Sequence, residues 1–265
     1  MEKEFNILKM RAEYSNPVRY LLNSENEEIF VNELIGKNLR IEWKGVINCI
    51  KCGNKTKKSF AQGYCYPCFI SAPETAPCIL QPELCEAHLG ISRDKEWSEK
   101  NCLTDHYVYL ALSSGLKVGV TRASQIPTRW IDQGAVKAVK LAKTPNRHIA
   151  GLIETDLKKY LSDKTSWQKM LKNNIDFEID LLSEKEKAGD ILRSDLSKYI
   201  TDDNEIFEIN YPVKNYPDKI KSINLDKTPE FSGKLIGIKG QYLIFDKGFV
   251  INIRKYGGYR MRFIY

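Results

Sequence analysis

The sequence predicts an α+β protein with a central three-stranded sheet and helices, preceded by a cysteine-rich segment and flanked by small β modules at both ends. Three observations predict this organisation. Both ends of the chain carry short runs of β-branched and aromatic residues between turn residues, cysteine pairs follow the first of these regions, and strand-like and helix-like patterns alternate in the middle.

Changes in composition divide the 265 residues into five segments. These are an N-terminal β module over 1–48, a cysteine-rich segment over 49–104, a central domain over 105–172, an acidic mixed α/β segment over 173–230 and a basic β module over 231–265. The two ends have a similar texture. This similarity indicates two small barrels, or one β module assembled from both ends, or only a chance likeness between β-rich segments.

Composition also bounds the environment of the protein. No apolar run approaches the roughly 20 residues that a membrane-spanning helix needs. The first residues are charged and lack the apolar stretch of a signal peptide. We therefore expect a soluble, cytoplasmic protein, in which seven cysteines favour metal ligation or free thiols over disulfides.

Charge is unevenly distributed along the chain. Residues 105–170 carry 11 basic and 5 acidic side chains, net +6, and residues 233–265 carry 7 basic and 1 acidic, again net +6. Residues 171–232 carry 9 basic and 14 acidic, net −5, and residues 1–104 are balanced at 14 of each. Two cationic blocks with interleaved aromatic residues favour a nucleic-acid surface, although a charge block is also typical of an ordinary solvated face.

Two cysteine pairs, Cys49-x2-Cys52 and Cys65-x2-Cys68, form the strongest motif. Each pair places two thiolates on one tight knuckle, and together they would complete a tetrahedral zinc shell. The alternatives are a redox dithiol and a chance spacing. Gly53 follows the first pair, where a knuckle needs an unhindered backbone. Because four thiolates leave no open position on the metal, we expect this first zinc to be structural.

A second zinc is expected from four further residues: Cys78, Cys85, His88 and Cys102. The spacing Cys85-x2-His88 is that of a knuckle, and the other two cysteines would close the shell. His106 follows shortly after and belongs either to this set or to the next site. The alternative is that these cysteines are small buried residues. Four prolines, at 67, 73, 77 and 82, predict a loop-dominated segment that metal holds together.

The central domain has a regular order of expected elements. Strands are expected over 106–112 and 116–122, a helix over 126–133 that ends at Asp132-Gln133-Gly134, a strand over 135–141 and helices over 147–161 and 162–171. Further on, Ser183 and Glu186 form a capping box that predicts another helix, and residues 205–213 alternate like a strand.

Residues 105–165 resemble the GIY-YIG endonuclease domain, which runs strand, strand, helix, strand, helix. The resemblance is carried by Val108-Tyr109-Leu110, Lys117-Val118-Gly119-Val120-Thr121, Arg129 and Glu154. The whole chain, with its two cysteine pairs and the run from Lys117 to Arg122, also resembles an uncharacterised bacterial family, domain of unknown function 2797.

The nuclease resemblance implies a catalytic site. Tyr109 matches the first tyrosine of that family, Arg129 its arginine, and Glu154 the carboxylate that holds Mg²⁺ or Mn²⁺. Lys117 stands where the second tyrosine is expected. A lysine acts as a base only if its pKa falls by several units from about 10.4, so contact with a phosphate is its simpler role.

Each of these residues also has an ordinary structural interpretation. Tyr109 on a strand is typical of a core position, and Arg129 beside Trp130 is typical of a surface arginine stacked on an aromatic ring. Glu154 has Lys158 four residues further along the same helix, which favours a surface ion pair.

Contacts to nucleic acid are expected from both basic blocks. The residues are Lys117, Arg122, Arg129, Arg147, His148, Arg254, Lys255, Tyr256, Tyr259 and Arg260. In the C-terminal block, cations would follow phosphates while exposed aromatic rings stack on bases. We expect the two tyrosines that flank Gly257-Gly258 to be the exposed ones.

Three functions fit these patterns. The first is a zinc-containing nucleic-acid-binding protein, RNA favoured over DNA, on a GIY-YIG-like scaffold without strong cleavage activity. The second is a divalent-metal-dependent endonuclease at Tyr109, Lys117, Arg129 and Glu154. The third is a structural or assembly protein that docks on another protein or on a ribonucleoprotein through the acidic segment and the zinc segment.

Overall fold

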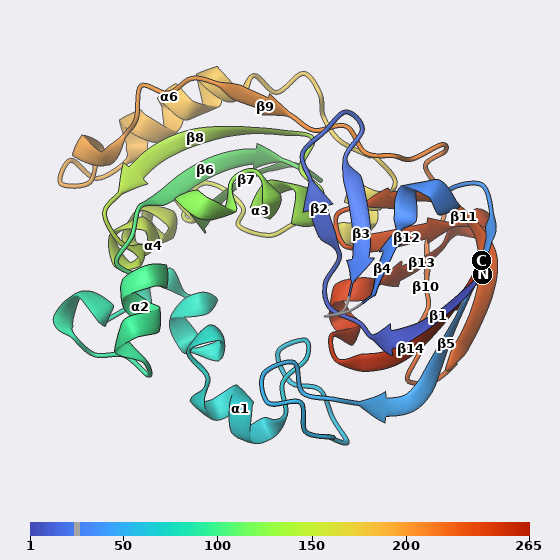
Figure 1. Cartoon of the computed structure of the whole chain (residues 1–265). Coiled ribbons are helices and arrows are strands. Elements are labelled where there is room, and N and C mark those ends of the chain that lie inside the picture. The colour runs from blue at the N-terminus through green and yellow to red at the C-terminus, as the bar shows by residue number, and fades with distance from the viewer. Residues whose placement is uncertain (24–26) are drawn as a thin grey trace. The chain divides into compact units, whose positions relative to one another are not determined.

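A computed structural model describes residues 1–23 and 27–265, which form two compact units (Figure 1). The first unit comprises residues 1–70, 171–173 and 209–265, and the second comprises residues 71–170 and 174–208. Among the described residues, no helix combines the length and the apolar character that a bilayer span needs.

A seven-stranded sheet dominates the first unit, in the order β1-β14-β5-β11-β12-β13-β10. Its strands are β1 (Glu2–Asn6), β5 (Asn38–Ile47), β10 (Lys221–Ser222), β11 (Glu230–Lys239), β12 (Tyr242–Phe245), β13 (Phe249–Asn252) and β14 (Tyr259–Ile264). Strand β5 lies between β14 and β11 and is antiparallel to both. Strands from the two ends of the chain therefore share one sheet.

A second, three-stranded sheet of this unit consists of β2 (Arg11–Glu13), β3 (Arg19–Asn23) and β4 (Glu28–Phe30), followed by the turn η1 (Val31–Leu34). Strand β3 is buried along its centre: Tyr20 and Leu22 are fully inaccessible, and Leu21 between them is also buried. The remaining 3₁₀ turns, η8 (Asp246–Gly248) and η9 (Ile253–Tyr256), connect the last three strands.

The second unit is built on a four-stranded antiparallel sheet in the order β7-β6-β8-β9. The strands are β6 (His106–Leu112), β7 (Leu116–Arg122), β8 (Lys137–Thr144) and β9 (Ile206–Glu208). Three strands were expected in this sheet, and the structure has four, because β9 from the acidic segment pairs with β8. Its alternating sequence had predicted a strand, but strand pairing between distant segments is decided by tertiary packing.

Helices complete the second unit: α3 (Thr128–Asp132), α4 (Arg147–Leu157), α5 (Trp167–Leu171) and α6 (Leu181–Ile191), with the turns η6 (Ala123–Gln125) and η7 (Ser197–Tyr199). Apolar residues of α4 and α6 form one core cluster with Val108 and Leu110 of β6. Asp180 caps α6 by accepting a hydrogen bond from the Leu182 N–H. Ser183 lies inside the helix, so the expected capping box is wrong.

The cysteine-rich segment contains mostly short turns, as its prolines predicted. Its elements are four 3₁₀ turns and two short helices: α1 (Tyr66–Ser71), η2 (Pro73–Thr75), η3 (Pro77–Ile79), η4 (Pro82–Leu84), η5 (Ala87–Leu89) and α2 (Lys95–Asn101). Prolines begin three of the 3₁₀ turns, where their fixed φ and missing N–H are tolerated. Such a segment buries little apolar surface of its own, so it depends on other contacts for its shape.

Candidate functional site

The first candidate metal site gathers Cys49, Cys52, Cys65 and Cys68 of the first unit. Their four sulfur atoms all lie within 4.8 Å of one another. The Cys52 and Cys65 sulfurs are 3.8 Å apart. Zinc bound tetrahedrally at 2.3 Å would place its sulfurs about 3.8 Å apart, so the cluster has the dimensions of a zinc site.

Backbone geometry shapes this four-cysteine site. Gly53 has a φ of +73°, and its N–H donates to the Cys49 carbonyl across the knuckle. Burial raises the pKa of the Cys49 thiol, but backbone N–H donors of Cys65, Cys52 and Lys51 outweigh it and lower that pKa to about 6. Cysteine binds metal as its thiolate, and a lowered pKa favours that form.

The second candidate metal site gathers three cysteines of the second unit: Cys78, Cys85 and Cys102. Their sulfurs also lie within 4.8 Å of one another. His88 does not belong to this group, and the expectation that it completes the shell is wrong. The turn η5 buries Ala87 and leaves His88 exposed, where its ring stacks on that of His148 with centroids 4.5 Å apart.

Arg147, expected to contact nucleic acid, instead supports the three-cysteine site. It is 8% exposed, and its guanidinium donates to the carbonyls of Cys78 at 3.4 Å and Asn101 at 3.0 Å. The neighbouring thiols Cys78 and Cys85, followed by the charge of Arg147, lower the pKa of Cys102. A buried cation beside thiolates offsets part of their negative charge.

The four predicted catalytic residues line one pocket of about 150 Å³ in the second unit. Tyr109 comes from β6, Lys117 from β7, Arg129 from α3 and Glu154 from α4. Residues Ile79, Leu80 and Pro82, which lie between the second site's first two cysteines, form another part of its wall. Four side chains that are distant in sequence therefore converge.

Tyr109 and Lys117 share a hydrogen-bond acceptor that the sequence did not reveal. The Tyr109 hydroxyl donates to Gln133 Oε1 at 2.9 Å, and the Lys117 ammonium donates to the same oxygen. Gln133 was expected only to end a helix, and it does follow α3 directly. Gly119 lies opposite Tyr109 in the β6–β7 pair, and a Cβ there would come within 2.6 Å of the tyrosine hydroxyl oxygen. The glycine therefore makes room for the ring.

The pocket shifts the pKa values of Lys117 and Glu154. Burial, followed by the nearby charge of Arg129, lowers the pKa of Lys117 to about 8. Burial also raises the pKa of Glu154, although the ammonium of Lys158, 3.3 Å away, opposes this. Lys158 in turn lies 3.5 Å from Asp163. The expected pair of Glu154 and Lys158 exists, but Glu154 is only 8% exposed and lies in the pocket wall rather than facing solvent.

The other expected nucleic-acid contacts of the second unit have partners within it. Arg122 donates to the side chain of Asn101, and His148 Nδ1 lies 2.8 Å from the Glu83 carbonyl oxygen. Arg129 is partly exposed at the pocket. Of these three residues, Arg129 has the geometry best suited to meeting a ligand in the pocket.

In the first unit, the expected exposure of Tyr256 and Tyr259 is wrong. They are 0% and 6% exposed, and their rings pack edge to face with centroids 5.2 Å apart. Their hydroxyls are bound inside the protein, Tyr256 accepting from the Leu225 N–H and Tyr259 donating to Asp226. The glycines between them turn the chain inward, so both rings belong to the core.

The cations of this C-terminal block are divided between surface and core. Lys255 and Arg260 are exposed and pair with Asp226 at 3.4 Å and Glu4 at 2.8 Å, and Arg254 is half-buried. Lys239 is fully buried, with its ammonium 5.3 Å and 5.0 Å from the ring centroids of Tyr211 and Tyr216. The formal charge of this block therefore overstates its surface charge.

Comparison with known families identifies one match. The model of a family described as a protein of unknown function, DUF2797, matches residues 36–261. The chain belongs to this family. No curated protein and no solved structure matches the chain. The DUF2797 match includes both cysteine clusters and all four residues of the pocket.

Proposed function

We propose that this protein acts on nucleic acid and that the pocket around Glu154 hydrolyses a phosphodiester with the help of a divalent cation. The convergence of Tyr109, Lys117, Arg129 and Glu154 in one pocket is the observation that carries this proposal. Buried, charged side chains with perturbed pKa values that meet in a pocket are typical of catalytic sites.

The side chains have complementary chemical roles. Lys117 has a pKa of about 8, so near that pH it can take a proton from an attacking water. Arg129 supplies positive charge for the phosphate oxygens as negative charge builds on them. Glu154 and Asp163 line the same pocket and offer the hard oxygen ligands that Mg²⁺ or Mn²⁺ prefers. The cation would supply Lewis-acid stabilisation of the phosphate.

The resemblance to the GIY-YIG domain supports the same assignment. The order β6, β7, α3, β8, α4 is the one that this resemblance implies, and Tyr109, Arg129 and Glu154 lie on the elements where it would require them. Lys117 departs from the pattern, since it replaces a tyrosine. Its hydrogen bond to Gln133, shared with Tyr109, gives the lysine a defined place in the pocket.

A specific contact favours a second function, binding of nucleic acid without cleavage. The ammonium of Lys158 lies 3.3 Å from Glu154 and 3.5 Å from Asp163, between the two carboxylates that would hold the cation. A lysine in this position can stand in for the metal charge while leaving the phosphodiester intact. Both functions predict binding, and only the first predicts hydrolysis. RNA is favoured over DNA on the presence of zinc knuckles and β modules.

Cleavage of end-labelled single-stranded and duplex RNA and DNA, with Mg²⁺ or Mn²⁺, tests the first function. Glu154→Gln and Arg129→Ala should each lower the rate roughly 100-fold or more. Lys143→Ala is the matched control, because Lys143 is an exposed cation of the same unit that pairs with Asp105 outside the pocket. Cleavage that survives both pocket substitutions would rule out this site as its source.

Binding without cleavage would support the second function instead. In that case, affinity for a mixed-sequence RNA should fall steeply with salt concentration, and Arg129→Ala should lower the slope of log K against log salt. Undetectable binding at low ionic strength would refute both functions.

A further inference from the structure

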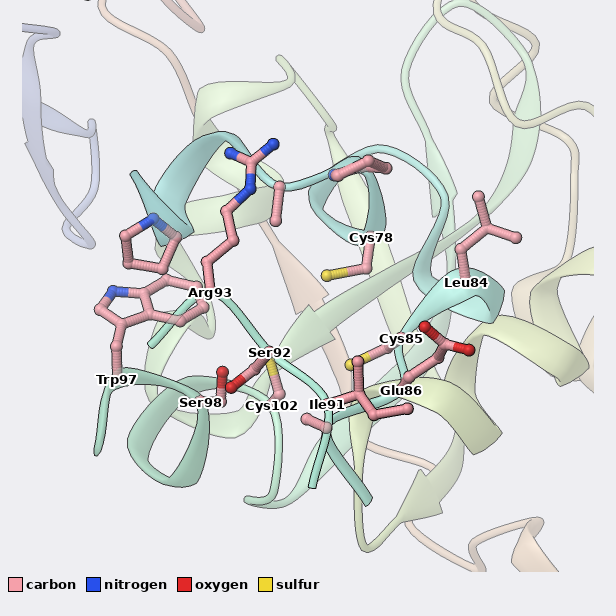
Figure 2. Close-up of a pocket in the computed structure, with 14 residues that line it drawn as sticks. Cys78, Leu84, Cys85, Glu86, Ile91, Ser92, Arg93, Trp97, Ser98 and Cys102 are labelled. Atoms are coloured by element: carbon pink, nitrogen blue, oxygen red, sulfur yellow. The ribbon is translucent and has the colours of Figure 1, made fainter. Parts of the chain in front are cut away.

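The three-cysteine site differs from the four-cysteine site in what surrounds it. Cys78, Cys85 and Cys102 all line one pocket of about 310 Å³ (Figure 2). The figure shows their sulfurs pointing toward one another at its centre. A metal ion held by these sulfurs would have three protein ligands and one side facing the pocket.

The sulfur spacing suits a single metal ion. All three sulfurs lie within 4.8 Å of one another, close to the roughly 3.8 Å expected between sulfurs on one tetrahedral zinc. Soft thiolate ligands select zinc among the common divalent cations. Three thiolates and an open fourth position are the ligand set of a reactive zinc centre rather than of a closed structural one.

Within the described part of the chain, no histidine, cysteine or carboxylate joins the three sulfurs at ligand distance. His88 is stacked on His148. Glu86 lines the pocket next to Cys85 but is not part of the cluster. His106 is the alternative candidate for the fourth ligand, because its buried Nε2 has no hydrogen-bond partner. Its Nδ1 lies 2.7 Å from the Thr104 carbonyl oxygen. It too lies outside the cluster.

We propose that Cys78, Cys85 and Cys102 hold a zinc ion whose fourth position opens into this pocket and binds a small thiol as its thiolate. In this step, the thiol loses its proton to the buffer, and its sulfur replaces a water molecule on the zinc. A centre already rich in thiolate favours another soft ligand over water, and a coordinating thiol is deprotonated on zinc. This inference is independent of the proposed hydrolysis at Glu154.

The residues that line the pocket indicate which thiols it should bind most tightly. Trp97, Leu84 and Ile91 present apolar surface, and Arg93 lines one side, held by hydrogen bonds from its Nη1 to the Ala72 carbonyl and the Thr75 hydroxyl. A guanidinium favours a carboxylate. A small thiol that also carries a carboxylate should therefore bind more tightly than a neutral thiol of similar size.

Cobalt substitution of the full-length protein tests the proposal. Co²⁺ replaces zinc in tetrahedral thiolate sites, and its visible absorption reports the ligands. We expect two cobalt ions per chain and a saturable spectral change on addition of mercaptoacetate, with weaker binding of mercaptoethanol. X-ray absorption of the zinc protein averages over both zinc ions, so it should show a mixed sulfur and oxygen shell that becomes all sulfur when mercaptoacetate is present.

Two variants make the test specific. Cys85→Ser should remove one metal and the whole response to thiol, while the four-cysteine site keeps its own metal. Ala76→Phe enlarges a lining residue of the pocket that is not a sulfur ligand, so it should keep both metals and weaken mercaptoacetate binding roughly tenfold. If Cys85→Ser does not fold, mercaptoacetate binding to Ala76→Phe still tests the proposal.

Three outcomes would overturn the proposal. The first is a metal content of one per chain in wild type. The second is histidine nitrogen as the fourth ligand, which would close the site through His106 or His88. The third is a cobalt spectrum that mercaptoacetate leaves unchanged, which would show that water or a protein group holds the fourth position.

Discussion

Replacing Gly151 with alanine is expected to destabilise the protein, although alanine is the better helix former. Gly151 lies inside α4, where turn η4 packs directly on the helix. A Cβ at this position would come within 2.1 Å of the Glu83 backbone nitrogen and 2.4 Å of the Pro82 carbonyl carbon. Both are backbone atoms, so rotation of a side chain cannot relieve the contact.

The expected change in the free energy of unfolding is the difference between two opposing contributions. Cβ atoms essentially never approach other heavy atoms closer than 3.0 Å, so η4 or α4 must move by 0.9 Å, the difference between 3.0 and 2.1 Å. Because the backbone itself must shift, we take the upper part of the usual range for overpacking a packed interior, about 2–3 kcal/mol. Alanine recovers about 1 kcal/mol of helix propensity. We therefore expect a net loss of roughly 1–2 kcal/mol.

Urea unfolding of the zinc-loaded protein measures this loss, and hydrogen exchange locates it in α4 and η4. Gly189→Ala is the matched control. It lies in α6, which like α4 has 11 residues, and its Cβ would meet only the flexible end of Ile200 at 3.2 Å. The control should be neutral or slightly stabilising. A Gly151→Ala protein as stable as wild type would refute the close packing of η4 on α4.

Three further predictions address the pocket, the core and the metals. Since burial lowers the pKa of Lys117 from 10.5 to about 8, the unfolded chain holds this proton more tightly, and stability should rise by about 3 kcal/mol between those pH values. The stability advantage of Lys117→Met over wild type should therefore shrink as pH rises through this window in urea titrations, and a constant advantage would contradict the burial of the charge. Tyr256→Phe leaves the Leu225 N–H without its acceptor and should cost about 1–3 kcal/mol of unfolding free energy, with no change in RNA affinity at a temperature where both proteins are folded. Elemental analysis should find two zinc ions per chain. Removal of zinc by a chelator should abolish hydrogen-exchange protection around residues 49–68. A metal-free preparation with full protection would contradict a structural role for zinc in this segment.

Local patterns predicted much of the second unit correctly. The hairpin of β6 and β7 was expected at the residues where it lies, because strand periodicity and a short turn are local properties. A short helix ending near Gln133 was also expected; α3 ends at Asp132, and Gly134 has the positive φ of +71° that a helix end favours. The four-cysteine cluster could be predicted because two knuckles require only short-range spacing.

Long-range packing decided what local patterns left open. His88 has knuckle spacing from Cys85, yet a 3₁₀ turn exposes it and brings its ring to His148. Tyr256 and Lys239 look like surface residues of a basic, aromatic segment, but the sheet buries both of them. Spacing along the chain cannot reveal which face of an element meets a partner that is distant in sequence.

The sequence alone determined the thiol-rich segment, the strand and helix order of the central domain, and the residue types of the proposed phosphodiester site. Only the tertiary structure decided that Tyr109, Lys117, Arg129 and Glu154 meet, with Gln133 between the first two. It also decided that three cysteines gather at a pocket, whereas four others lie within ligand distance of one another. The physical reason is that ligand spacing and periodicity are local, whereas burial, desolvation and an open coordination position depend on which distant segments pack together.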